Sequence, residues 1–396
     1  TQNQAVIEDQ LFKKRSKGIP PQLFLYDVTS SYLEGEQNEM ADWGYNRDKK
    51  KGKKQIVIGL MCDEDGIPVT TEVFKGNTQD TATFAAQINK AKERFKCENV
   101  TFVGDRGMIK SGQIDALEKH GYHYITALTK KQIETLIDNA IIDYSLFDTT
   151  ICEANCGGVR YIFRRNPVRA EEIANSRFSK KEGIAKLITE QNIYLKTHVK
   201  AKAKTALERV NKKIQKLGLA KLVSVQEEAR TLVLTVLEEI WSADSKLDGC
   251  YVIKTDLPSS VADTDTIHAR YKDLALVESA FRTVKSDLDI RPVYVRKEES
   301  TRGHVLVVML AYMIIKELDK LWSRLYLTVS EGLRSLATLC FLEVSVKGMM
   351  FQQIPQPRLQ NQKLLDAAGI DLPKILPKST ARVVTRVRRR KSVSNA

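Results

Sequence analysis

The chain has 396 residues, more than one compact core of ordinary size contains, and this length predicts two domains or one domain with a large insertion. Lys and Arg number 63 against 49 Asp and Glu, which gives a formal charge of +14. This excess argues against an acidic small substrate and favours a polyanionic partner, with nucleic acid as the first candidate. A basic surface without a binding role is the alternative.

The six cysteines are scattered along the chain, and the one close pair, Cys152 and Cys156, has no second pair or histidine nearby. This spacing disfavours a zinc site. The chain has no charged-then-apolar leader, and its longest apolar run, residues 305–315, is too short to span a bilayer. We therefore expect a reducing, cytoplasmic setting with no membrane partner. Because the chain begins at Thr1, we also expect a natural amino-terminal segment to be missing from it.

The first predicted element is a buried strand at residues 23–28 (LFLYDV), which contains one acid, Asp27. A polar, Lys-rich loop at residues 46–54 follows. Two strand-like runs then flank a turn at residues 65–66, a pattern typical of a β-hairpin. Three lysines of the loop are candidates for contact with DNA: Lys49, Lys50 and Lys51.

Asp80 or Thr78 is expected to cap the next helix, which runs to about Arg94. The run ENVTFVGDRGM then predicts a second buried strand that ends on Asp105 before a glycine turn. A helix at 111–119 and a strand at 122–128 complete the order of three strands, helix, strand, helix and strand.

This alternation of predicted strands and helices is absent between about residues 130 and 248, where a long basic helix-like stretch covers 178–217. We interpret this part as an insertion. The pattern resumes with a strand at 250–256, a long amphipathic helix at about 266–288 and an apolar helix at about 301–321.

The end of the chain is strongly basic, with eight Lys and Arg residues and no acid after Asp371. We expect a solvated, disordered tail that holds phosphates without sequence specificity. Its candidate DNA contacts are Arg388, Arg389 and Arg390.

Two acids at strand positions, Asp27 and Asp105, can lie side by side if their strands are neighbours. Unpaired buried carboxylates cost several kcal/mol, so such acids usually pair with cations or coordinate metal. The alternative for each is a strand-end acid that caps a turn.

The helix near Glu278 presents polar residues on one side. With a rotation of about 100° per residue, Glu278, Arg282 and Lys285 all fall within about 40° of Tyr271. The opposite side is apolar and is expected to be buried: Leu276, Val277, Ala280, Phe281, Val284 and Leu288. An ordinary solvated face with helix ion pairs is the alternative.

Three oxygen ligands without a histidine or cysteine cluster suit Mg²⁺, with Mn²⁺ as a substitute. Such ions promote in-line displacement at phosphorus, so the pattern indicates phosphoryl transfer on nucleic acid. Arg282 would then hold a backbone phosphate with its fork, and Lys285 would act as a point charge.

Four motifs together resemble the DDE transposases of bacterial insertion sequences, in the group with a Y-x2-R-x3-E-x6-K signature. They are LYDVTSSY (25–32), VFKGNTQD (73–80), VGDRGM (103–108) and YKDLALVESAFRTVKSDLDIRPVY (271–294), and the likeness runs from about residue 23 to 318. The resemblance implies that Asp27, Asp105 and Glu278 are catalytic metal ligands and that Tyr271 and Lys285 contact DNA near the cleaved end.

The resemblance also implies an α/β fold, a ribonuclease H-like mixed sheet flanked by helices, with a large insertion before the last catalytic helix. Leu274 departs from the signature, which has arginine there, and we expect Arg282 to supply the missing cation. The insertion is expected to cover the DNA end. The expected parts are a residual segment at 1–22, a catalytic domain at 23–129 and 250–325, an insertion at 130–249, a helical region at 326–373 and a basic tail at 374–396.

Weaker candidates have structural alternatives. Asn77 and Asp80 match the family's G-N-x-x-D pattern, although we favour a helix cap for Asp80. Arg302 and His304 resemble a family pair, and a buried, satisfied polar pair explains them equally well. Trp241 can stack on a base, but a core position is preferred. Arg106 follows the second Asp directly.

We therefore predict a metal-dependent DNA transposase that acts on double-stranded DNA as a homodimer. A ribonuclease H-like nuclease without strand transfer is one alternative. A DNA-binding relic of a transposase without catalysis is the other.

Overall fold

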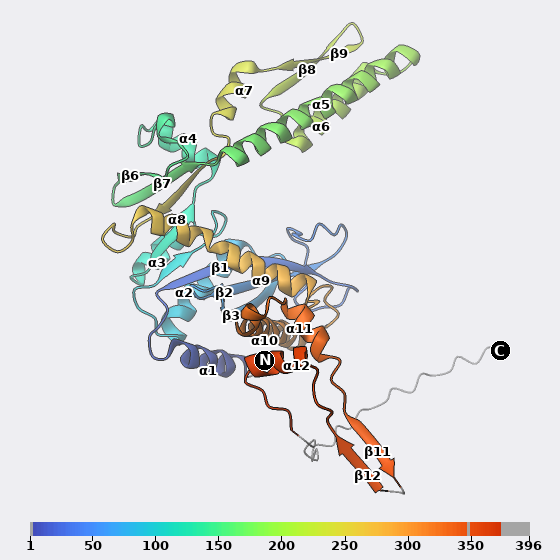
Figure 1. The fold of residues 1–396 in the computed structure, drawn as a ribbon. Coiled ribbons are helices and arrows are strands. Elements are labelled where there is room, and N and C mark those ends of the chain that lie inside the picture. The colour runs from blue at the N-terminus through green and yellow to red at the C-terminus, as the bar shows by residue number, and fades with distance from the viewer. Residues whose placement is uncertain (1–2, 347–348, 374–396) are drawn as a thin grey trace, which may run out of the picture. The chain divides into compact units, whose positions relative to one another are not determined.

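An eight-stranded mixed sheet forms the centre of the main part of the protein (Figure 1). The structure is a computed structural model that describes residues 3–346 and 349–373. It divides into two compact units, Thr1–Met309, which contains the sheet, and Leu310–Ala396. The strand order is β3-β2-β1-β4-β5-β10-β7-β6. The strands are β1 (Leu23–Tyr32), β2 (Gln55–Cys62), β3 (Pro68–Lys75), β4 (Thr101–Val103), β5 (His123–Ala127), β6 (Cys152–Cys156), β7 (Val159–Arg165) and β10 (Cys250–Thr255).

The first five strands have the predicted order, and the first three form the predicted hairpins. β1, β2 and β3 are antiparallel, whereas β4 and β5 run parallel to β1. β2 (QIVIGLMC) is buried along its whole length because helices cover both faces of the sheet there. This is the topology of the ribonuclease H-like fold, and the predicted fold class is confirmed.

The predicted turn at residues 65–66 joins β2 to β3. Gly66 has a φ of 73°, which glycine adopts without strain, and a Cβ there would lie 2.6 Å from Leu276 Cβ. The hairpin turn therefore packs directly against the helix that carries Glu278.

Alternation along β1 assigns its side chains to two faces of the sheet. Phe24, Tyr26 and Val28 belong to one hydrophobic core together with residues of α2 (Asp80–Asn89) and α3 (Ser111–Lys119). The intervening residues, Asp27 among them, face the other side, because successive side chains of a strand point in opposite directions. A short π-helix, η1 (Lys90–Arg94), extends α2.

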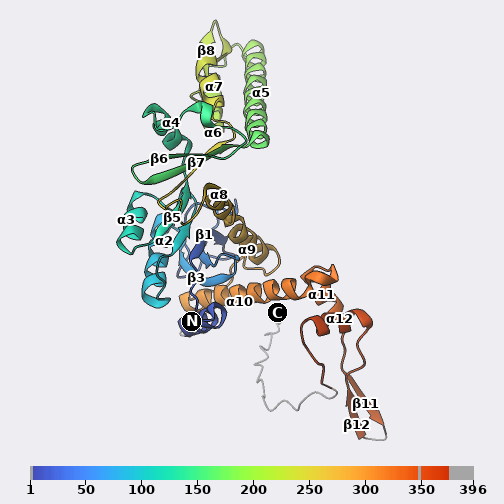
Figure 2. The same cartoon turned by 60° about the vertical axis from the view of Figure 1, so that its left-hand side comes forward.

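Two helices cross this second face, α8 (Thr264–Lys272) and α9 (Leu274–Ser286) (Figure 2). The sequence predicted a single helix here. The chain breaks at Asp273, whose amide donates both to Ala269 O and to Arg270 O, and α9 starts at the next residue. Tyr271 therefore belongs to α8 and Glu278 to α9, although both remain near the same acids.

Part of the expected insertion belongs to the main sheet. β6 and β7 lie within residues 130–249 but pair next to β10, and α4 (Lys130–Asp138) and the turn η2 (Tyr144–Leu146) precede them. The remainder is a lobe with its own hydrophobic core (Figure 1). The lobe consists of α5 (Pro167–Thr197), α6 (Ala203–Leu217), β8 (Val223–Glu228), β9 (Thr231–Val236) and α7 (Glu238–Ser245).

The amino-terminal segment is a helix, α1 (Gln4–Ser16), that the sequence did not predict. Its Glu8 is buried and accepts hydrogen bonds from Thr70 Oγ1 at 2.9 Å and Arg94 Nη1 at 2.7 Å. These contacts attach α1 to β3 and to the end of α2.

The second unit begins inside the apolar helix α10 (Glu298–Trp322), at Leu310 and not near residue 325 as expected. Trp322 forms a small core with Val329 and Leu364, and its Nε1 donates to Leu364 O at 3.0 Å. The other elements are η3 (Ser323–Leu325), α11 (Val329–Leu336), β11 (Leu342–Val346), β12 (Met349–Gln353) and α12 (Leu359–Ala367). The region is thus helical with a β-hairpin inserted.

In the part of the chain that the structure describes, no helix is long and apolar enough to cross a membrane. The basic tail, with Arg388, Arg389 and Arg390, lies outside the described residues.

Candidate active site

The strand register places Asp27 and Asp105 side by side. β1 and β4 pair in parallel with Leu25 opposite Val103, and each Asp follows its partner residue by two positions. Asp27 therefore lies on the face of Leu25, which α9 covers, and Asp105 follows the end of the neighbouring strand close enough for its charge to act on Asp27. Asp27 is half-buried, and Asp105 is exposed just beyond the end of β4.

Among the described residues, no strand pairs with the edge of β1 on the side of β4 beyond Leu25 until Leu33 is reached. β4 pairs with residues 23–25 only, and farther along the edge Tyr32 O accepts from Val293 N at 2.9 Å. Between these points the edge is met by the loop before β2, where Ser30 Oγ accepts from Arg47 N at 3.0 Å and Asp48 Oδ2 from Tyr32 N at 3.3 Å. Along β1, Asp27 thus lies between the residues that pair with β4 and those that contact the Arg47–Asp48 segment.

α9 carries the third acid. The apolar side predicted for this helix is buried at Val277, Ala280, Phe281 and Val284, and it packs on β1 and β2. Glu278 is exposed, as expected for a residue on the other side.

Asp105 and Glu278 both lie within electrostatic range of Asp27. The pKa of Asp27 is raised from 3.8 to about 7, first by burial and then by the like charges of Asp105 and Glu278, against the opposing effects of the Val28 amide and Arg47. Tyr271 faces the same group: burial raises the pKa of its phenol to about 12, and Asp105, Glu278 and Asp27 contribute to the rise.

The donor set fits a hard divalent cation because it consists of carboxylate oxygens and includes a half-buried acid beside two like charges. The carboxylates do not form a ready chelating cluster. Among residues 3–346 and 349–373, no three His, Cys, Asp or Glu side chains are arranged to hold a metal ion. Asp105 Oδ1 instead accepts from the Gly107 and Met108 amides at 2.7 and 3.1 Å.

Lys285 binds an acid that the sequence reasoning did not single out. Its Nζ lies 2.8 Å from Asp48 Oδ1, and Arg291 Nη1 contacts the same oxygen. The Asp48 side chain is 1% exposed and that of Lys285 12%. Burial lowers the pKa of Lys285, and the hydrogen bond to Asp48 opposes that effect.

Asp80 binds Arg47 and does not cap α2. The N-cap residue is Gln79, without a side-chain cap, so the predicted cap by Asp80 or Thr78 is wrong. Both oxygens of Asp80 accept from Arg47 Nη2, at 2.7 and 2.8 Å. The feature of the sequence that could have indicated Arg47 and Asp48 as site residues is their position as an Arg-Asp pair directly before three lysines.

The remaining candidates differ in their surroundings. Arg106, Asn77, Arg282 and the loop lysines 49–51 are exposed, and Lys50 lies over the ring of Tyr32. Arg302 and His304 are half-buried, with Arg302 Nε bonded to Glu298 at 2.9 Å. Trp241 packs against the core of the lobe, as preferred from the sequence, beneath Arg177.

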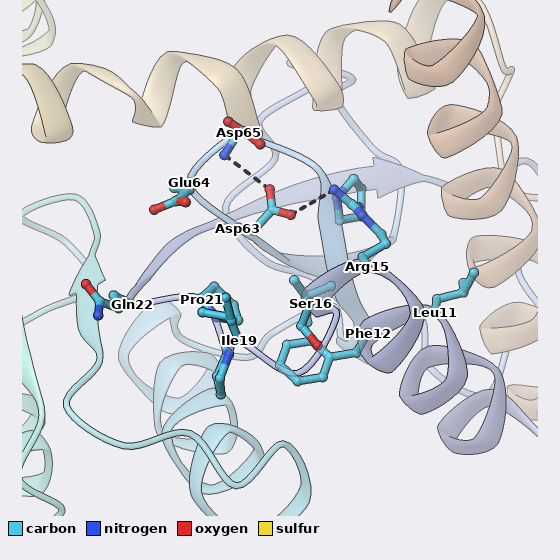
Figure 3. Close-up of a pocket in the computed structure, with 13 residues that line it drawn as sticks. Leu11, Phe12, Arg15, Ser16, Ile19, Pro21, Gln22, Asp63, Glu64 and Asp65 are labelled. Atoms are coloured by element: carbon cyan, nitrogen blue, oxygen red, sulfur yellow. Dashed lines mark hydrogen bonds and ion pairs between the residues drawn. The ribbon is translucent and has the colours of Figure 1, made fainter.

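A cavity of about 310 Å³ between α1 and the β2–β3 turn is lined by none of the candidate residues (Figure 3). Asp63, which lines the cavity, accepts hydrogen bonds from Arg15 Nη2 at 2.9 Å and from the Asp65 amide at 3.2 Å. The cavity is therefore separate from the three carboxylates.

A ribonuclease H-like sheet with acids beyond β4, within β1 and on a covering helix is typical of proteins that act on nucleic-acid phosphodiester bonds. The family model described as transposase DDE domain matches residues 18–314, and the chain belongs to this family.

Two solved structures are similar to parts of the chain. The piggyBac transposase synaptic complex with hairpin DNA has 7% identity and a TM-score of 0.41 over 75% of this chain and 46% of that one. The Mos1 transposase paired-end complex with left transposon end has 14% identity and a TM-score of 0.20 over 31% and 40%. The chain thus spans about half the length of the piggyBac transposase. No curated protein sequence matches it.

Proposed function

We propose that this protein is a DNA transposase that cuts at the ends of an insertion sequence and joins them to target DNA. Membership of the transposase DDE domain family supports the class of reaction. The observation that carries the proposal is the register of β1 and β4, which sets Asp27, on the face covered by α9 with Glu278, beside Asp105.

Asp27, Asp105 and Glu278 would hold Mg²⁺. When bound, the metal activates an attacking oxygen and stabilises the leaving oxygen of a phosphodiester. Asp27 contributes a fixed position, because β2 pairs with β1 along its length. Tyr271 and the exposed Arg106 and Arg282 would orient the DNA backbone around these acids.

The reaction proposed has two displacements. Water first replaces the 3′-oxygen at the phosphorus of the element's end, which leaves a free 3′-hydroxyl and a 5′-phosphate. That hydroxyl then replaces a bridging oxygen in target DNA, so one phosphodiester forms as another breaks. Because two ends must be joined, we propose that the chain acts as a homodimer on DNA.

The test uses duplexes made from the DNA that flanks the natural gene on both sides, which contains the two element ends. We expect Mg²⁺-dependent cleavage at one position in each flank, and joined products when a duplex already cut there is mixed with plasmid. Cleavage without joined products would favour the nuclease alternative, and binding without cleavage the non-catalytic one.

Metal uptake should depend on pH through Asp27. An acid with a pKa of about 7 is mostly protonated at pH 6, and a metal must displace that proton. We therefore expect Mn²⁺ affinity, measured by isothermal titration, to rise about tenfold from pH 6 to pH 8. Asp27→Asn should remove this dependence, and uptake by the natural chain that is equal at both pH values would contradict the assignment.

A further inference from the structure

The signature that the sequence resembles has arginine where this chain has Leu274. Leu274, at the position of the signature arginine, is a half-buried apolar residue. Lys285 is bound to Asp48, and Arg282 is exposed without a side-chain hydrogen bond to any described residue. Arg47 is a further cation close to Asp27, and its side chain is held by Asp80.

Arg47 stands at the edge of β1 on the side of β4. Leu33 N donates toward β2, to Lys54 O at 3.0 Å, so the N–H of Tyr32 points to the opposite edge, where Asp48 accepts it. Arg47 is the preceding residue and bonds to Ser30 on the same strand. Ser30 is on the α2 side of the sheet, whereas the adjacent Asp48 binds Lys285 of α9, so the Arg47–Asp48 segment wraps around this edge of β1 close to Asp27.

The position of Arg47 is fixed from several sides. Its amide is bonded to the fully buried Ser30, and its Nη2 is held by both oxygens of Asp80. The next residue, Asp48, is held by Lys285 and Arg291. A side chain held in this way loses little conformational freedom when it binds a ligand.

Two of the three guanidinium nitrogens of Arg47 donate no hydrogen bond within the described residues. Nε and Nη1 form no hydrogen bond with any residue that the structure describes, and the side chain is 24% exposed. A guanidinium with one anchored nitrogen and two free ones can donate parallel hydrogen bonds to two oxygens of a phosphate.

We propose that Arg47 contacts the backbone phosphate of the DNA end with Nε and Nη1, in place of the arginine that the signature has at position 274, and that Asp80 is its positioning residue. The proposal rests on the proposed function. It gives a role to Asp80, which has no part in binding metal.

The test compares single-turnover cleavage of the flank-derived duplex in Mg²⁺ by the full chain and its variants. We expect Arg47→Met to slow cleavage about 10²- to 10³-fold, the loss typical of one removed donor to the reacting phosphate. Arg47→Lys keeps the charge but not the fork and should slow cleavage about tenfold. The matched control is Arg334→Met, at an exposed arginine of α11 outside the proposed site, which should leave the rate unchanged.

Asp80→Asn tests positioning. We expect it to slow cleavage about tenfold, and Arg47→Met/Asp80→Asn to be no slower than Arg47→Met, because Asp80 acts through Arg47. Independent, multiplying losses would show that Asp80 has another role and would overturn that part.

DNA binding separates this proposal from the proposed function. The slope of log affinity against log salt for the same duplex should fall by about one in Arg47→Met, since one phosphate contact is lost. If the natural chain binds but does not cleave, the proposed function fails and the slope alone decides the role of Arg47. An unchanged slope in Arg47→Met, or an equal fall in Arg334→Met, would overturn the proposal.

Discussion

Asp27→Asn should abolish Mg²⁺-dependent cleavage of the flank-derived duplex while DNA binding stays close to that of the natural chain. The substitution preserves the size of the side chain but removes the negative charge that a metal requires. Asp105→Asn and Glu278→Gln should have the same effect, a loss of roughly 10⁴-fold or more in the cleavage rate, as for removal of central catalytic groups. The matched control is Asp65→Asn, in the exposed β2–β3 turn.

The same change should stabilise the metal-free fold. Because the pKa of Asp27 is raised from 3.8 to about 7, ionisation is disfavoured in the folded state, and stability falls as pH rises through this interval. At pH 8 the variant should be more stable than the natural chain by roughly 2–4 kcal/mol, and at pH 4 the two should be equal. Undiminished cleavage by the variant, or equal stability at both pH values, would contradict the role given to Asp27.

Asp48→Asn should produce the largest loss of stability among single changes at the site. The Asp48 carboxylate is 1% exposed and neutralises Lys285 and Arg291, so its removal leaves a buried ammonium without a counter-charge. Such losses cost roughly 3–5 kcal/mol. Urea denaturation would measure the loss in the free energy of unfolding. Hydrogen exchange of the β1 and β2 amides would show whether the loss occurs at the site.

Glu34→Gln is the control for Asp48, because its pair with Lys53 is exposed and should contribute less than about 1 kcal/mol. Asp48→Asn/Lys285→Met should recover part of the stability, since the unpaired cation is then removed. The interpretation is wrong if Asp48→Asn costs no more than Glu34→Gln.

The β1–β2–β3 hairpins, α3 and the apolar side of α9 followed from local patterns, because a repeat of two or 3.6 residues identifies the buried face of a strand or helix. The motifs around Asp27, Asp105 and Glu278 indicated the family that the chain belongs to. These patterns did not predict the helix break at Asp273, because the repeat of apolar residues continues almost unchanged across it.

The sequence by itself determined the fold class, the order of the first five strands and the family, since these depend on periodicity and on short motifs. Only the tertiary structure decided that β6 and β7 extend the main sheet, that Asp48 binds Lys285 and that Asp80 holds Arg47. The physical reason is that an ion pair joins residues far apart in the chain, 237 positions for Asp48 and Lys285, and a loop without a repeat does not reveal which partner its charges will meet.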